Sequence, residues 1–163
     1  MKPSVTRPVG GADCRDVLIR RATARDAKRL TRLVRNSRAY EGPYATMVAG
    51  YRVGPDYIET HRVFVAVHSG TDQLLGFYSL VLEPAELDLM FVADDAQGLG
   101  IGRLLIAHLR GEAQLAGLTG VRIVSHPPAE GFYRSVGALR TGTAAANPPA
   151  VMWDRPELTL PVA

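Results

Sequence analysis

Cysteine is almost absent from this chain, whose 163 residues include one, Cys14. A single cysteine cannot form an internal disulfide, which fits a protein of the reducing cytoplasm. No apolar run approaches the roughly 20 residues that a membrane-spanning helix requires. Residues 1–16 lack the apolar segment of a secretory signal, and their proline, glycine and small polar residues predict a flexible tail. The sequence therefore predicts a cytoplasmic protein without a membrane partner.

Charge of one sign is also scarce, since the formal net charge is only +3 at pH 7. Basic residues gather in one place, at Arg25, Lys28, Arg29, Arg32 and Arg35. A nucleic-acid surface usually shows a stronger basic bias, so we interpret this cluster as a solvated helix face and expect no nucleic-acid partner. Hydrophobic residues make up 47% of the chain and charged residues 21%, as in an ordinary soluble domain, which we place at residues 17–163.

Strand and helix signals alternate along the rest of the chain. Thr23-Ala-Arg-Asp26 has the spacing of a capping box, and apolar residues follow it at helical intervals. Pro55, directly after a glycine, indicates a second helix start. We expect strands at 17–21, 62–68, 74–82, 86–92 and 121–125, helices at 23–37, from 54, at 102–116 and at 126–136, and two weak strands within 139–163. This order predicts a mixed α/β domain.

The strand expected at 86–92 carries polar and apolar residues in alternation. Successive side chains of a strand point to opposite faces of its sheet. This alternation predicts one face made of Leu87, Leu89 and Phe91, and an opposite face made of Glu86, Asp88, Met90 and Val92.

A glycine-rich turn follows that strand and opens the next helix, with the sequence Gln97-Gly98-Leu99-Gly100-Ile101-Gly102. Glycines let the backbone turn its N–H groups toward one point and let a ligand approach closely. The helix that follows adds its free N–H donors and its dipole. The turn therefore predicts an anion site suited to a pyrophosphate, with Arg103 as a cation at its rim.

Other glycine-rich motifs fit this turn less well. A dinucleotide fingerprint needs Gly-x-Gly-x-x-Gly at the first β-α turn and an acid about 20 residues later. Here the motif lies in mid-chain, after strands that are expected to pair in an antiparallel manner. A Walker A loop needs Gly-Lys-Ser/Thr, which the turn lacks. A purely structural turn is the remaining alternative.

The glycine turn belongs to a longer run, Phe91-Val-Ala-Asp-Asp-Ala-Gln97-Gly-Leu-Gly100-Ile-Gly102, and a second motif follows at Ala129-Glu-Gly-Phe132-Tyr133-Arg-Ser-Val-Gly137-Ala138. The first run resembles the acetyl-CoA signature Arg/Gln-x-x-Gly-x-Gly/Ala of the GNAT superfamily of N-acetyltransferases, and the second resembles a downstream motif of the same family. The order of elements from Val17 to about Val151 is similar to the family's layout. The resemblance implies a central mixed, mostly antiparallel sheet flanked by helices, in which the fourth and fifth strands splay apart.

The resemblance also implies roles for individual residues. Acetyl-CoA would be the cosubstrate, with its pantetheine bonded to the backbone at Met90, Phe91 and Val92 and its pyrophosphate held by the amides of Gln97, Gly98, Leu99, Gly100, Ile101 and Gly102. Phe132 is placed with these cofactor-binding residues. Tyr133 matches the tyrosine that protonates the departing CoA thiolate in many members. Glu86, eleven residues before Gln97, lies where some members carry a general-base carboxylate.

Elementary chemistry agrees with these roles. An amine that attacks a thioester must be neutral, so a group of the site must accept a proton, and the leaving thiolate gains from a nearby donor. A tyrosine hydroxyl, with a pKa of about 10, can supply that proton. Neither a metal nor a covalent intermediate is required. Tyr133 could instead be a half-buried helix residue, and Glu86 a solvated residue or an ion-pair partner, in which case Asp88 and His126 are the next candidate bases.

The acceptor site is expected among the tyrosines of residues 40–57 and at His126. We assign Tyr40, Tyr44 and His126 to the substrate, with ordinary packing and a turn or helix-cap role as the alternatives. No long extension for a peptide or nucleic acid is present, so a small-molecule primary amine is the expected acceptor. A protein N-terminus or lysine is the alternative acceptor, and a non-catalytic acyl-CoA sensor is the alternative of another class. A homodimer is compatible with the resemblance.

Overall fold

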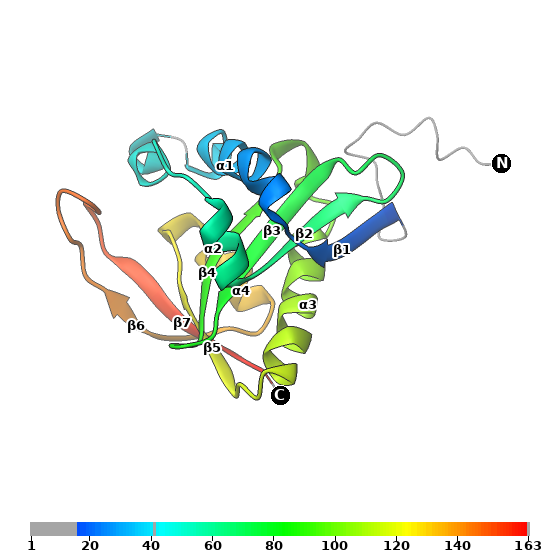
Figure 1. The fold of residues 1–163 in the computed structure, drawn as a ribbon. Coiled ribbons are helices and arrows are strands. Elements are labelled where there is room, and N and C mark those ends of the chain that lie inside the picture. Colours follow the sequence, from blue (N-terminus) through cyan, green and yellow to red (C-terminus); the bar gives the residue numbers. More distant parts are fainter. Residues whose placement is uncertain (1–15, 41, 163) are drawn as a thin grey trace.

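Residues 16–40 and 42–162 are described by a computed structural model (Figure 1). Cys14 and all but the last residue of the expected tail lie outside these ranges. The sheet has seven strands in the order β1-β2-β3-β4-β5-β7-β6. Its strands are β1 (Val17–Arg21), β2 (Arg62–His68), β3 (Leu74–Val81), β4 (Glu86–Val92), β5 (Gly120–Val124), β6 (Leu139–Ala144) and β7 (Arg155–Pro161). Every pair is antiparallel except β4–β5, which confirms the expected mixed, mostly antiparallel sheet.

Helices cover both faces of the sheet (Figure 1). The α-helices are α1 (Ala27–Arg35), α2 (Pro55–Thr60), α3 (Ile101–Leu115) and α4 (Glu130–Ser135). One hydrophobic cluster joins α3 to strand residues such as Leu80 and Val121. A second cluster joins α1 and α2 to the opposite sheet face through Leu30, Ile58 and Val65. Because both faces are covered, the central residues of β2 and β3 are buried without interruption.

The parallel pair β4–β5 separates soon after it begins. Its only paired residues are Glu86 with Arg122 and Leu87 with Ile123. Both strands continue beyond these pairs, β4 to Val92 and β5 to Val124, without bonding to each other. The splay expected for the fourth and fifth strands is therefore present. It leaves backbone groups of β4 open toward a gap in the middle of the sheet.

A β-bulge interrupts β4 at Asp88, and the expected alternation is wrong at this point. Leu80 of β3 pairs with Leu87, and Ser79 pairs with Leu89, so Asp88 has no partner opposite it. Leu87 consequently packs in the α3 cluster, together with Met90 and Val92, whereas Leu89 and Phe91 pack with α1 and α2. The extra residue thus places Leu87 on the opposite face of the sheet from Leu89 and Phe91, whereas strict alternation predicts all three on one face.

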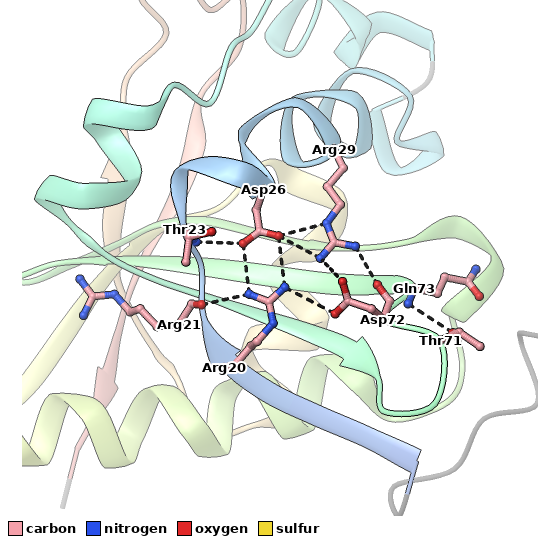
Figure 2. Close-up of polar contacts among 8 residues, drawn as sticks. All are labelled: Arg20, Arg21, Thr23, Asp26, Arg29, Thr71, Asp72 and Gln73. Atoms are coloured by element: carbon pink, nitrogen blue, oxygen red, sulfur yellow. Dashed lines mark hydrogen bonds and ion pairs between the residues drawn. The ribbon is translucent and has the colours of Figure 1, made fainter.

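An ion-pair network fastens β1, the start of α1 and the β2–β3 turn to one another (Figure 2). The buried Asp26 carboxylate accepts hydrogen bonds from Arg20 at 3.1 and 3.2 Å, from Arg29 at 2.9 Å and from the Thr23 amide at 2.8 Å. Asp72, in the β2–β3 turn, pairs with both arginines. Burial alone would raise the pKa of Asp26, but these hydrogen bonds outweigh it and lower the pKa to about 2.

Replacing Asp26 with Asn should destabilise the fold at neutral pH by about 2 kcal/mol. This is the free energy that corresponds to lowering the pKa of Asp26 from 3.8 to about 2 on folding. A depressed pKa contributes stability that is present above the unfolded value and is lost as the pH falls through about 2. The difference from wild type should therefore shrink on acidification. Denaturant titrations at pH 7 and pH 3 measure it, with the exposed Asp56→Asn as control. Equal effects of the two substitutions at pH 7 would contradict the network's role.

Candidate active site

A cavity of about 610 Å³ lies where β4 and β5 separate. Residues 87–92 of β4 form one wall, and residues 123–126 at the end of β5 form the facing wall. The glycine turn and the first turn of α3 close one end. Tyr40, Tyr51 and Arg155 also line the cavity, and Phe132 and Tyr133 approach from α4. The splay thus turns a gap in the sheet into a site that elements from the whole chain surround.

The glycine turn presents its backbone toward this cavity. Gly98 and Gly100 both have a φ of +81°, a left-handed conformation that favours glycine, and a Cβ at either position would meet open space. Gly100 is the N-cap of α3, whose first backbone bond runs from Leu104 N to Gly100 O at 3.1 Å. The amides before Leu104 are therefore the free donors of a helix N-terminus. Open space above free amides fits the pyrophosphate of coenzyme A.

Contacts of Gln97 and Gly102 hold the turn in shape. Gln97 donates from its amide Nε2 to the Val92 carbonyl at 3.0 Å, so the motif's first residue ties the turn to the end of β4. A Cβ on Gly102 would come within 2.9 Å of the Phe132 ring, so this third glycine allows α3 and α4 to pack closely. Arg103 lines the cavity beside the turn and bonds Ser135 at 3.4 Å.

Tyr133 lies on α4 and is buried beside the cavity that it lines. Burial, and secondarily the neighbouring Tyr40, raise its pKa above the ordinary value of 10.0. Its phenol therefore stays protonated at neutral pH. Within the described part of the chain, no side chain engages its hydroxyl in a hydrogen bond. A protonated phenol beside the cavity is suited to donate a proton to a leaving group.

An aromatic cluster closes the end of β5. Tyr40 stacks on the His126 ring at 4.1 Å between centroids, and Tyr44 meets both His126 and Trp153 edge-on. The His126 Nε2 lies 3.1 Å from the Ala39 carbonyl, which makes Nε2 the protonated nitrogen. Burial lowers the pKa of His126, and the imidazole is therefore neutral at neutral pH. Its side chain caps no helix, although its backbone is the N-cap of a short 3₁₀ turn.

A chain of hydroxyl groups positions Asp88 at the cavity wall. Tyr57, on α2, donates a short hydrogen bond to the Asp88 carboxylate. The buried Ser79 hydroxyl donates to the Tyr57 oxygen at 2.6 Å. Burial first, and then the bond to Asp88, raise the pKa of Tyr57, so the phenol remains a donor. Three elements therefore fix one carboxylate, with one of its oxygens held by Tyr57.

Glu86 has different surroundings. It lies at the first residue of β4, where β4 and β5 are still paired, and it forms an ion pair with Arg122 at 3.4 Å. Arg122 is bound more closely by Glu157, at 2.9 Å. Glu86 is not among the described residues that line the cavity. Of the two interpretations of Glu86, ion-pair partner and base, this geometry matches the first.

The structure brings most of the expected site residues to one cavity. Those that line it are Met90, Phe91, Val92, Gln97, Gly98, Gly100, Ile101, Gly102, Arg103, Phe132, Tyr133, Tyr40 and His126. Glu86, Leu99 and Tyr44 are not among the lining residues described, and Tyr44 reaches the site only through its contact with His126. The sequence offers Asp88 as an alternative base, but no sequence pattern indicates its hydrogen bond to Tyr57. Nor does any pattern indicate that Arg155 lines the cavity.

Metal-binding and membrane features were sought in the same ranges. Residues 16–40 and 42–162 hold no group of three or more His, Cys, Asp or Glu side chains able to bind a metal ion. None of the helices described has both the length and the apolar character needed to cross a membrane.

Comparison with known proteins gives a family and a fold. Residues 59–137 match the family model described as the GNAT acetyltransferase domain, and they include the glycine turn and Tyr133. A search of curated protein sequences gave no match.

Three solved structures illustrate the fold. An N-acetyltransferase from Staphylococcus aureus is 16% identical and has a TM-score of 0.69, over 90% of this chain and 99% of that chain. The Escherichia coli enzyme that acetylates an alanine of a ribosomal protein is 19% identical, with a TM-score of 0.67 over 90% and 94%. Spermidine N-acetyltransferase from Vibrio cholerae, in complex with CoA and spermine, is 19% identical, with a TM-score of 0.68 over 90% and 96%. Residues 59–137 therefore match a GNAT acetyltransferase domain, and the chain has the fold of these acetyltransferases.

Proposed function

We propose that this protein transfers the acetyl group of acetyl-CoA to the primary amine of a small molecule, by direct attack within a ternary complex. The observation that carries the proposal is one continuous cavity, which connects the free amides of the Gln97–Gly102 turn with Tyr133 and Asp88. Acetyl-CoA supplies an activated thioester. The turn binds its pyrophosphate, and the open edge of β4 at Met90–Val92 offers backbone partners to its pantetheine.

The chain's own residues divide the proton transfers between them. Asp88 accepts a proton from the acceptor's ammonium and so frees the amine, whose nitrogen then forms its bond to the acyl carbon. Tyr133 gives its proton to the sulfur as the carbon–sulfur bond breaks, and the second proton of the nitrogen restores the phenol. Charge and atoms balance, because one proton ends on the thiol and the proton on Asp88 passes to solvent. The aromatic cluster around His126 keeps water from the thioester.

The size of the cavity supports a small acceptor. About 610 Å³ is within the usual range for small-molecule sites, and the cosubstrate's thiol end takes up part of it. The spermine complex among the similar structures illustrates a small amine acceptor, whereas the Escherichia coli enzyme illustrates a protein acceptor. Release of free CoA thiol over a panel of small amines, with a peptide of free N-terminus and a lysine peptide as competitors, tests this preference. Transfer to the peptides alone would reject a small-molecule acceptor.

Replacing Gly100 with Val should abolish the stabilisation of the fold by acetyl-CoA. At 100 times its Kd, a ligand that binds only the native state stabilises by about 2.7 kcal/mol, which a thermal shift measures. A valine at Gly100 would strain a backbone with a φ of +81° and place a branched side chain over the free amides.

Gly117→Val is the matched control, because Gly117 lies just beyond the other end of α3, with a φ of +78° and open space around its Cβ position. Gly117→Val should introduce similar backbone strain and retain the full thermal stabilisation by acetyl-CoA. A Gly100→Val variant that retains the shift would remove the main support for cosubstrate binding at this turn.

A further inference from the structure

Arg155 is a charged residue of the cavity that has no part in the reaction steps above. It is the first residue of β7, at the point where that strand leaves β5. The last β5–β7 pair is Val124 with Glu157, and the Ser125 amide then donates to the Pro156 carbonyl at 3.0 Å. Beyond this point β7 pairs with β6 alone, as the projecting β6–β7 hairpin in Figure 1 shows. Arg155 therefore lies beside the end of β5, on the side of the gap that faces away from β4.

The side chain of Arg155 has an unsatisfied donor. Its Nε is buried, and no hydrogen-bond partner for it exists among the described residues. Arginines of the neighbouring strands are held by carboxylates, Arg122 by Glu157 at 2.9 Å and Arg140 by Glu130 at 2.9 Å. In the ranges that the structure covers, no ion pair joins Arg155 to a carboxylate. A buried donor without an acceptor is costly, and this cost would be relieved by a bound anion.

Arg155 brings a positive charge to the part of the cavity near Tyr40. Burial raises the pKa of Tyr40 to about 12, and the charge of Arg155 opposes that rise, so the guanidinium lies near the Tyr40 hydroxyl. His126 is neutral, because burial lowers its pKa. Arg103 lies in the first turn of α3, beside the glycine turn. Arg103 and Arg155 are thus the two fixed cations among the described lining residues, and Arg155 is the one beside Tyr40.

We propose that Arg155 binds a carboxylate of the acceptor, and that the acceptor is an amino acid or a similar small amine that carries a carboxylate. The inference rests on the proposed function and names the substrate class of the same site. Asp88 supplies the opposite charge on the same cavity, so a zwitterion meets an anion at its ammonium and a cation at its carboxylate. A guanidinium holds a carboxylate with two parallel N–H bonds, and Nε is one such donor. A polyamine would bring a second ammonium toward Arg155, and like-charge repulsion disfavours it.

Acid and amide pairs of acceptors test this proposal, since an amide keeps the amine and the side chain and removes only the carboxylate. Glycine, leucine and phenylalanine, each with its carboxamide, and spermidine serve as probes. In wild type the kcat/KM for the acids should exceed that for the amides by about 10–100-fold, the usual worth of a bidentate charged contact. Arg155→Met should abolish this preference and leave KM for acetyl-CoA unchanged. Arg155→Lys should restore part of it, because the charge remains without the fork.

Arg140→Met is the control, because Arg140 is exposed, bonds Glu130 and is not among the described lining residues. It should leave the preference for acids intact. A preference that persists in Arg155→Met, or a wild type that acetylates amides or spermidine as well as acids, would overturn the proposal. Thermal shifts with CoA present measure acceptor binding without any transfer. Thermal shifts that occur with the acids and require Arg155, without transfer to any acceptor, would support the carboxylate subsite and reject the proposed function. Transfer to amines without a preference for acids would support the proposed function and reject the subsite.

Discussion

Tyr133→Phe is expected to lower kcat by about 10²–10⁴-fold, the usual contribution of a positioned general acid, with little change in KM for acetyl-CoA. The phenylalanine ring fills the same buried space on α4, so cosubstrate binding should survive. Only the hydroxyl disappears, and with it the proton for the departing thiolate. Because burial raises the pKa of Tyr133, wild type should keep this donor through the whole neutral and mildly alkaline range. Steady-state kinetics with acetyl-CoA as the varied substrate separate the two constants.

Tyr78→Phe is a matched control for the loss of one buried hydroxyl. Tyr78 lies on β3 under α3, where its hydroxyl is 2.7 Å from His108 Nδ1, and it is not among the described residues that line the cavity. The substitution should lower stability by about 1 kcal/mol through the lost hydrogen bond and leave kcat unchanged. Equal losses of kcat in the two variants would indicate a packing effect. Full activity in Tyr133→Phe would show that the thiolate leaves without this donor.

The sheet and its helices were largely predictable, because local patterns determine them. The periodicity that predicts a helix at 102–116 reflects the face that α3 buries against the sheet, and the structure has this helix at Ile101–Leu115. The two weak strand signals near the C-terminus correspond to β6 and β7. The glycine turn was predictable for a similar reason, since Gly98 and Gly100 occupy the left-handed conformations that glycine favours.

The arrangement of the acceptor site was not predictable from local pattern. Strict alternation along β4 places Asp88 on one face with Met90, and only the pairing with β3 reveals the bulge that separates them. The bond from Tyr57 to Asp88 joins residues 31 positions apart. Arg155 lines the cavity because β7 is inserted between β5 and β6, against the order of the sequence. Such features depend on topology, and a single sequence carries no sign of them.

Asp88 and Glu86, the two carboxylates of β4, are the competing candidates for the general base, and we propose Asp88. Asp88→Asn should reduce kcat/KM for the amine by about 10²–10⁴-fold, because the amide has nearly the same size and cannot accept the proton. Glu86→Gln should have a much smaller effect, since Glu86 pairs with Arg122 and is not among the described residues that line the cavity. Each substitution removes one negative charge from the same strand. The pair therefore controls for the general loss of attraction toward a cationic acceptor.

The pH dependence distinguishes proton transfer from binding or folding. Below the ammonium's pKa of about 10.4, the fraction of free alkyl amine rises about tenfold for each unit by which the pH is raised. Asp88→Asn should therefore recover part of its activity as the pH rises, whereas a binding defect should persist. Tyr57→Phe removes the donor that orients the Asp88 carboxylate and should reproduce a smaller share of the loss, again in kcat/KM for the amine. A Glu86→Gln variant with the large, alkali-rescued loss, beside an active Asp88→Asn, would move the base to Glu86. A proton relay from the amine to Glu86, which is not among the described residues that line the cavity, would then have to be sought.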